Sequence, residues 1–278
     1  MVWLKECFEG LPDPRTGNAV RHNMLEMLTI SLVASVCGAE SCSDFADFGH
    51  DREALFREFL TLEHGIPSHD TFSRLFRLLR PEAFSACFAR FAEALGADGK
   101  GVVAIDGKTL RGSFDKAAGA SALQVVAAFG CDARMVLHQV AVPDGSNEIT
   151  AARTLLGLLD LTGVLVTGDA AHCQTETAKT IAERGGDWMF ALKANRPALL
   201  ADAVALFADP HAAVETATTV DAGHGRMETR RQSVCTDIDW IFSERRYPDE
   251  PRMPGLAMLG MLESIVERDG KTTAERRY

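Results

Sequence analysis

The hydrophobic pattern changes its period near residue 100, and this change constrains the fold more than any other feature of the sequence. Up to residue 96, apolar residues recur every three or four positions, which predicts one helix after another. Beyond a link rich in glycine and aspartate, Gly96 to Gly101, short apolar runs of strand length alternate with helical segments. We therefore predict an all-α domain over residues 1–96 and an α/β domain over residues 101–278.

The first domain contains two instructive helices. One carries an apolar stripe that we expect to be buried, formed by Leu25, Leu28, Leu32, Val33 and Val36. A later helix is predicted over Thr71 to Arg80, with capping oxygens supplied by the residues just before it. Its polar side presents Arg74, Arg77 and Arg80. These arginines form either a DNA-binding surface or an ordinary solvated face, since exposed arginines often have no specific partner.

The second domain reads in the order β-β-β-α-β-α-β, three strands in a meander and then parallel crossovers. The predicted segments are strands at 102–105, 123–129, 135–142, 164–167 and 188–192, and helices at 148–159 and 174–184. This order describes a mixed sheet with helices on its faces, as in ribonuclease-H-like nucleases. From residue 201 to 278 the pattern weakens to a helix, a strand pair and an irregular stretch rich in proline and arginine.

Composition narrows the class of protein. The 278 residues carry 29 basic and 39 acidic side chains, a net charge of −10, so a DNA partner must be bound by local basic patches. Seven cysteines without a C-x-x-C pair fit a reducing cytoplasm. The longest apolar run, Met24 to Ala39, is too short and too polar to span a bilayer, and no secretory signal precedes it. We expect a cytoplasmic protein without a membrane partner.

Two aspartates follow predicted strands at matching positions. Asp106 ends the first strand of the second domain, and Asp169 ends the fourth. If these strands are neighbours, both carboxylates lie at one edge of the sheet and require a cation between them. Oxygen ligands favour Mg²⁺ or Mn²⁺, and a metal pair of this kind catalyses phosphodiester chemistry. The alternative for each aspartate alone is a turn former or a helix N-cap.

Two glutamates are further candidates for a third acid. Glu148 opens a helix where ribonuclease-H-like nucleases often place a metal-facing carboxylate; the alternative is a charge that complements the helix N-terminus. Glu228 could also close a three-acid site. We favour its pairing with Arg226 and Arg230 on a surface strand.

Two basic clusters flank the aspartates. Lys108 and Arg111 follow Asp106, and Lys193 and Arg196 follow the last predicted strand. Together around an acidic pair they indicate a DNA track, although each cluster alone could be a solvated strand end. His172 and Cys173 are residue types that bind zinc, but the sequence has no matching partner motif, so we disfavour a zinc site.

At these residues the chain resembles bacterial insertion-sequence transposases of the H-repeat-associated type, which belong to the DDE group with a ribonuclease-H-like core. The resemblance covers essentially the whole chain. The motifs that carry it are Asp13-Pro14-Arg15, Gly65 to Phe72, Ala104 to Ser113, Ser146 to Ala151, Thr167 to Ala170, Cys173-Gln174, Ala191 to Lys193, and His224-Gly225-Arg226 with Glu228 and Arg230.

The resemblance implies a function. Asp106 and Asp169 would be the first two acids of the DDE triad and bind two divalent ions, Mg²⁺ or Mn²⁺. The partners would be double-stranded DNA, both transposon ends and target, with a homodimer on DNA as one arrangement in the bacterial nucleoid. The third acid of such families lies in a later helix, so we expect a chain truncated at its C-terminus, weak or inactive alone, with apolar surface that favours self-association. The alternatives are a non-catalytic DNA-binding remnant and a ribonuclease-H-like nuclease without strand transfer.

Overall fold

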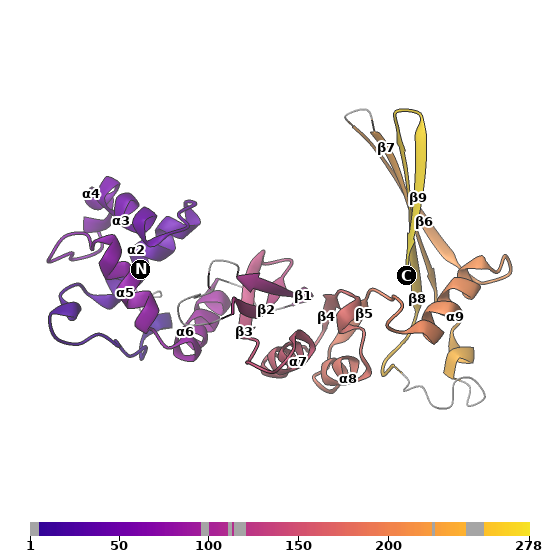
Figure 1. Cartoon of the computed structure of the whole chain (residues 1–278), viewed down its shortest axis with the longest axis horizontal. Helices are drawn as coiled ribbons and strands as arrows, with labels where there is room; N and C mark the ends of the chain where they lie inside the picture. The colour runs from indigo at the N-terminus through magenta and orange to yellow at the C-terminus, as the bar shows by residue number, and fades with distance from the viewer. Residues whose placement is uncertain (1–5, 96–99, 111–112, 114–120, 224–225, 243–252) are drawn as a thin grey trace. The chain divides into compact units, whose positions relative to one another are not determined.

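The computed structural model describes residues 6–95, 100–110, 113, 121–223, 226–242 and 253–278. The chain divides into two compact units, Met1–Asp98 and Gly99–Tyr278 (Figure 1). The described part contains no helix long and apolar enough to cross a membrane.

The first unit is helical, and its helices pack around a phenylalanine-rich core. Asn23 caps the first long helix through its side chain, and a capping box at Ser41 and Asp44 starts the next. The helices are η1 (Gly17–Val20), α2 (Met24–Val36), α3 (Cys42–Asp51), α4 (Glu53–Arg57), α5 (His69–Leu78) and α6 (Pro81–Ala94).

The buried stripe of α2 differs from the predicted one. Met27, Ile30 and Ala34 are fully buried, whereas Val36 is 82% exposed. Leu25, Leu32 and Val33 pack only against the edge of the core. The prediction for Val36 was wrong because this helix is apolar on most of its circumference, so its sequence does not show which side faces the core.

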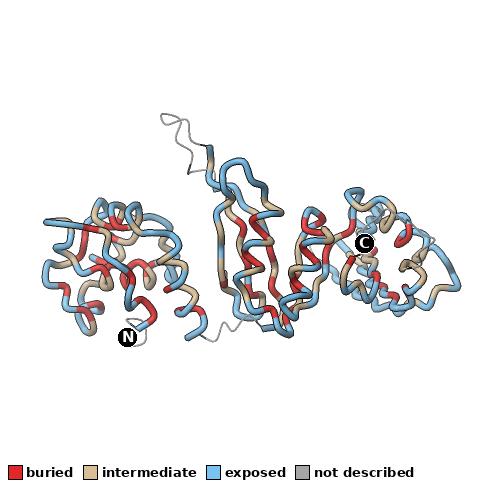
Figure 2. The backbone as a smooth tube through the Cα atoms, turned by 90° about the horizontal axis from the view of Figure 1, so that it is seen from below, coloured by how far each residue is buried: buried red, intermediate tan, exposed pale blue. Residues whose placement is uncertain are grey.

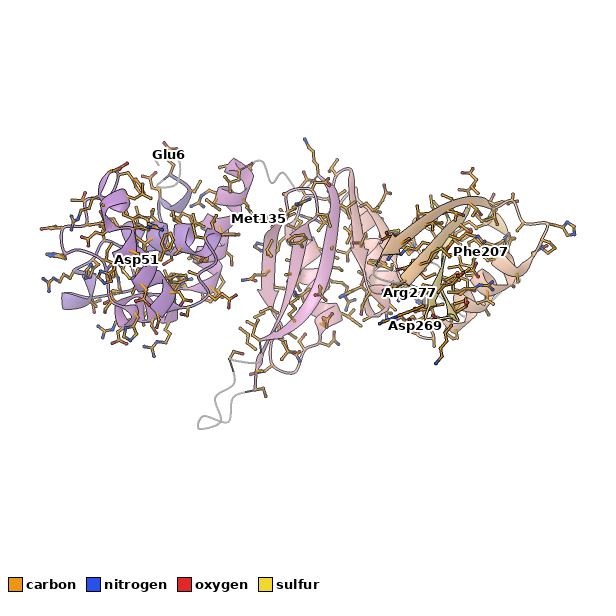
Figure 3. The ribbon with its side chains drawn as sticks, turned by 90° about the horizontal axis from the view of Figure 1, so that it is seen from above. Glu6, Asp51, Met135, Phe207, Asp269 and Arg277 are labelled. Atoms are coloured by element: carbon orange, nitrogen blue, oxygen red, sulfur yellow. The ribbon has the colours of Figure 1, made fainter. Side chains whose placement is uncertain are left out.

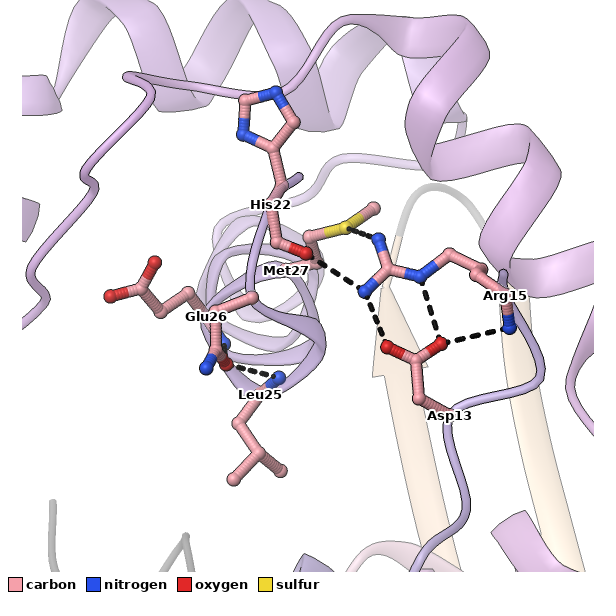
Figure 4. A network of polar contacts seen from close by, with 7 residues as sticks. Asp13, Arg15, His22, Leu25, Glu26 and Met27 are labelled. Atoms are coloured by element: carbon pink, nitrogen blue, oxygen red, sulfur yellow. Dashed lines mark hydrogen bonds and ion pairs between the residues drawn. The ribbon is translucent and has the colours of Figure 1, made fainter. Parts of the chain in front are cut away.

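The Asp13-Pro14-Arg15 motif anchors the segment before α2 (Figure 4). The guanidinium of Arg15 is 4% exposed and donates to both carboxylate oxygens of Asp13, at 2.9 and 2.7 Å. It also donates to the carbonyl oxygen of His22 at 2.8 Å and contacts the Met27 sulfur. Each of the three nitrogens of this buried guanidinium therefore has a partner, which gives Asp13 and Arg15 of the motif a structural role.

The second unit is built on a five-stranded mixed sheet of order β3-β2-β1-β4-β5. The meander of the first three strands is antiparallel, and β4 and β5 join β1 in parallel. The strands are β1 (Gly101–Leu110), β2 (Leu123–Gly130), β3 (Met135–Ala141), β4 (Val164–Gly168) and β5 (Asp187–Phe190). With the helical first unit, this topology confirms the predicted ribonuclease-H-like class.

Two helices, α7 (Glu148–Leu158) and α8 (Thr175–Glu183), contact each other and pack on the strands. Buried residues alternate with less buried ones along β1 and β4, as the red segments of the tube in Figure 2 show. Val103 lies opposite Val166, and with Ile105 they are buried on the face that the helices cover. The opposite face keeps apolar side chains partly exposed, among them Phe129 at 39% and Met189 at 59%.

The C-terminal part of this unit corrects the sequence prediction. Instead of a strand pair and an irregular stretch, helix α9 (Pro197–Ala208) is followed by a four-stranded antiparallel sheet of order β6-β7-β8-β9. The strands are β6 (Glu215–Gly223), β7 (Arg226–Cys235), β8 (Leu259–Arg268) and β9 (Lys271–Arg277). Asp269 and Gly270, both with positive φ, form the tight turn between β8 and β9 (Figure 3).

Candidate functional site

The strands that carry the two aspartates are neighbours and parallel. Their ladder runs from Gly101 opposite Val164 to Ala104 opposite Thr167. The ladder ends two residues before each aspartate, so Asp106 and Asp169 follow paired positions of two adjacent strands. The condition that these strands are neighbours is met. The roles of the two aspartates stay a prediction.

Asp106 does not end its strand, contrary to the sequence analysis. The parallel ladder with β4 stops at Ala104, but β1 continues to Leu110 and pairs Asp106 with Ala127 of β2. Asp106 thus lies where β1 leaves β4. Its side chain is 69% exposed, and the Nζ of Lys108 lies 3.9 Å from its Oδ2.

Asp169 follows β4 directly, as predicted, and is exposed. Its Oδ1 accepts the backbone N–H of Ala171 at 2.8 Å and caps the short 3₁₀ helix η3 (Ala170–His172). The residue therefore performs the capping role that was its simpler interpretation. Because this hydrogen bond fixes the orientation of the carboxylate, the same side chain would also suit a metal ligand.

Glu148 lies at the first position of α7, next to its cap Asn147. Its carboxylate occupies the space beside Gly107, where an added Cβ would lie 2.2 Å from the glutamate Cδ. Its Oε1 is 3.2 Å from Nε2 of His172. Successive residues of a strand face opposite sides of the sheet. The contact between Gly107 and Glu148 therefore lies on the helix-covered face, whereas Asp106 faces the opposite side.

The predicted DNA-contacting residues near the acids differ in their environment. Lys108 and Lys193 are exposed. Arg196 instead donates to the carbonyl oxygen of Cys173 at 3.2 Å and to the hydroxyl of Thr175, which gives it a structural role. Arg111 lies outside the described residues.

The segment after β5 lies beside the turn that follows Asp169. The side-chain amide of Asn195 donates to the carbonyl oxygen of Ala170 at 2.7 Å, within the same turn that Asp169 caps. Lys193, two residues earlier, is exposed and interacts electrostatically with Glu275 of β9. Sequence reasoning did not assign Asn195 a role, since nothing in its pattern shows the turn as its partner.

On the first unit, Arg74 and Arg77 are exposed on α5. Arg77 donates only to the carbonyl oxygen of Ser73, at 3.4 Å, and neither arginine forms an ion pair with another described residue. Arg74 and Arg77 thus lie exposed on one helix of the first unit, as the sequence predicted.

Glu228 is not a third acid in this structure. It lies on β7 and accepts from the guanidinium groups of both Arg226 and Arg230, the second at 2.8 Å. These partners lower the pKa of Glu228 against the opposing effect of desolvation. The favoured surface pairing is confirmed. The preceding residues of its motif, His224 and Gly225, lie outside the described residues.

The residues present fit a hard divalent cation in part. Asp106 and Asp169 supply two carboxylates at one edge, and Mg²⁺ is commonly held by one or two carboxylates with water and substrate phosphate completing its shell. Across the described residues, no three His, Cys, Asp or Glu side chains are grouped to hold a metal ion. The third acid expected of a triad is therefore not assembled in this part of the chain.

Each of the two units matches a known protein family. A family profile described as "DDE_Tnp_1-associated" matches residues 5–92, and one described as "Transposase DDE domain" matches residues 97–226. Neither match depends on the geometry described above, and together they cover both the helical unit and the five-stranded sheet.

Three curated relatives extend the comparison. An "Uncharacterized protein in dhlA 3'region" of Xanthobacter autotrophicus is 42% identical over 98% of this chain and 92% of its own length. The "H repeat-associated putative transposase YbfD" of Escherichia coli K12 is 34% identical over 84% of this chain and 93% of its length. The "H repeat-associated putative transposase YhhI" of the same organism is 34% identical over 84% of this chain, and this chain spans 62% of its length.

Proposed function

Because the chain belongs to the bacterial DDE transposases of the H-repeat-associated type, we propose that it acts on the DNA ends of an insertion sequence by phosphodiester hydrolysis and strand transfer. The observation that supports this proposal is the parallel pairing of β1 with β4, whose ladder ends at Ala104 opposite Thr167, two residues before each aspartate. Two carboxylates that follow such positions would share a divalent cation, which offsets their mutual repulsion.

Asp106 and Asp169 would hold the divalent ion, Mg²⁺ or Mn²⁺. When bound, such an ion supplies an activated water and stabilises the leaving oxygen of a phosphodiester. The protein's own contribution is to fix both carboxylates on rigid elements. Asp106 lies within a paired strand, and the turn capped by Asp169 fixes the second carboxylate.

The DNA backbone would be bound by local cations against the overall charge of −10. Lys108 is exposed beside Asp106, and Lys193 is exposed after β5, so both would be available to phosphate oxygens. Arg111 follows Lys108 closely in sequence and is proposed for the same track. Arg74 and Arg77 on α5 would contact the transposon end from the first unit, since neither has a competing carboxylate among the described residues.

Catalysis by this chain would be weak. Among the described residues no three His, Cys, Asp or Glu side chains are grouped to hold a metal ion, and loss of a key electrostatic group in such a site costs on the order of 10²–10³ in rate. The same observation favours a second candidate function, a non-catalytic DNA-binding protein that occupies transposon ends.

The test is cleavage and joining with a duplex that carries the end of the encoding insertion sequence, with Mg²⁺ or Mn²⁺ and a target plasmid. Slow, metal-dependent cleavage that Asp106→Ala and Asp169→Ala both abolish would support the transposase. End binding that survives both substitutions, with no cleavage at any metal concentration, would instead establish the non-catalytic protein. Cleavage without joined products would indicate a nuclease.

A further inference from the structure

His172 is the most deeply buried ionisable side chain near the acidic edge. Its side chain is 1% exposed, and within the described residues neither ring nitrogen has a hydrogen-bond partner. Buried polar groups in folded proteins are almost always hydrogen-bonded, because an unpaired one loses its bonds to water without replacement. A histidine that remains in such a position needs an explanation beyond filling space.

The imidazole is fixed between two elements. On one side it contacts Gly168, where an added Cβ would lie 3.2 Å from the His172 Cδ2 and 3.3 Å from its Cβ. On the other side its Nε2 is 3.2 Å from Oε1 of Glu148, close enough to attract the carboxylate although the alignment falls short of a hydrogen bond. The ring therefore joins the end of β4 to the start of α7.

The carboxylate of Glu148 is in turn held against β1. An added Cβ on Gly107 would lie 2.2, 2.4 and 2.6 Å from its Cδ, Oε2 and Oε1. Only glycine leaves room for a carboxylate at this distance, and the backbone of Gly107 needs no left-handed conformation to explain the residue. Glu148 thus fills the gap between β1 and His172.

Each end of this chain of contacts is attached to one of the two aspartates. Gly107 directly follows Asp106. His172 closes the turn that Asp169 caps, with its N–H donating to the carbonyl oxygen of Asp169 at 3.2 Å. A displacement of either Glu148 or His172 would therefore be transmitted to a segment that carries an acid.

We infer that His172 is a positioning residue, which holds the carboxylate of Glu148 against Gly107 and so fixes the separation of Asp106 and Asp169. The inference rests on the proposed function, in that the two aspartates hold a divalent ion. It gives Glu148 an indirect role in place of the direct catalytic one considered from the sequence. Residues that orient metal ligands typically change metal affinity 10–100-fold when they are substituted.

Three substitutions of His172 separate this role from simple core filling. His172→Gln places an amide nitrogen near the position of Nε2 and keeps a donor for Glu148. His172→Asn places its amide near Nδ1, away from Glu148, and His172→Phe keeps the ring without any donor. The readouts are the Mn²⁺ dissociation constant of the full chain, measured by electron paramagnetic resonance, and hydrogen exchange of the segments 104–110 and 168–173.

The expected result is a Mn²⁺ dissociation constant raised about tenfold by His172→Asn and His172→Phe, and less than about twofold by His172→Gln. Exchange of both segments should accelerate in the first two variants and stay at the wild-type rate in the third. Glu148→Ala should raise the dissociation constant to the same extent as His172→Phe, and combining the two should add little.

Two results would overturn the inference. One is equal Mn²⁺ affinity and equal exchange rates in all three His172 variants, as for a side chain that only fills space. The other is a loss of Mn²⁺ binding in Glu148→Ala as complete as in Asp106→Ala with no effect of His172, which would make Glu148 a direct ligand. If the unmodified chain binds no Mn²⁺, the proposed function fails, and the exchange rates alone decide whether His172 positions these segments.

Discussion

Substitution of Gly107 by alanine tests the packing of Glu148 without touching either aspartate. The new Cβ would lie 2.2 Å from the glutamate Cδ, so the carboxylate must move by about 1.2 Å to reach an ordinary 3.4 Å contact. Glu148 is 43% exposed and can turn toward water, so the expected cost is its lost packing rather than a rigid clash. We expect Gly107→Ala to lower the free energy of unfolding by about 1–2 kcal/mol.

The same substitution should behave differently when the glutamate is absent. In a Glu148→Ala background the three atoms nearest to the added Cβ are absent, and a strand alanine should then be neutral or stabilising by up to about 1 kcal/mol. The double-mutant cycle should therefore give a coupling energy of about 1–2 kcal/mol. Urea denaturation provides the measurement, with tryptophan fluorescence as the signal, since Trp188 lies on β5 of the same unit.

A matched control is available within the same unit. Gly157 lies in α7 with no atom within 4 Å of an added Cβ, so Gly157→Ala should stabilise by about 0.5–1 kcal/mol in either background. The reasoning is refuted if Gly107→Ala has the same effect, within about 0.5 kcal/mol, with and without Glu148. That result would mean that the carboxylate does not occupy the space beside the strand.

Three further expectations follow from other contacts. Glu263 is 8% exposed and forms ion pairs with arginines of two neighbouring strands. Glu263→Ala should therefore lower the free energy of unfolding, measured in urea, by about 1–3 kcal/mol. The hydrogen bond from Arg15 lowers the pKa of Asp13 below its usual value. This contact therefore stabilises the fold above about pH 4, and its contribution is lost as the pH falls through the lowered pKa. Asp13→Asn should flatten that part of a Tm-against-pH curve. Lys108→Gln and Lys193→Gln should each reduce the slope of log affinity against log salt by about one in DNA-binding titrations.

The order of elements in the second unit could be predicted because each element buries one side. The strands β1 and β4 alternate buried and partly exposed residues, and the helices between the strands have caps that the sequence shows, such as Asn147 before α7. The predicted order β-β-β-α-β-α-β leaves few ways to arrange a sheet, since parallel crossovers are almost always right-handed. The order alone leaves open which strands are neighbours, and the structure shows that β4 pairs with β1.

The four-stranded sheet could not be predicted in the same way. All nine residues of β6 and all seven of β9 are exposed, so neither strand shows the alternation of apolar and polar residues that signals a half-buried strand. Their stability comes from partners distant in sequence, such as the carboxylate of Glu263 between Arg231 and Arg276. Interactions of this kind leave no local pattern.

The candidate site shows a related limit, because the sequence suggests its two aspartates but gives no sign of the contacts around them. Asp106 and Asp169 were found from strand ends, and the ladder of β1 with β4 supplies the neighbourhood that this reasoning required. Gly107 and Gly168 gave no signal of their own, since a glycine after a strand usually indicates a turn. In the structure the first makes room for Glu148 and the second for the ring of His172. A carboxylate and an imidazole can therefore join two acid-bearing segments only where two glycines leave them space, and that condition is visible only once α7 is packed on the sheet.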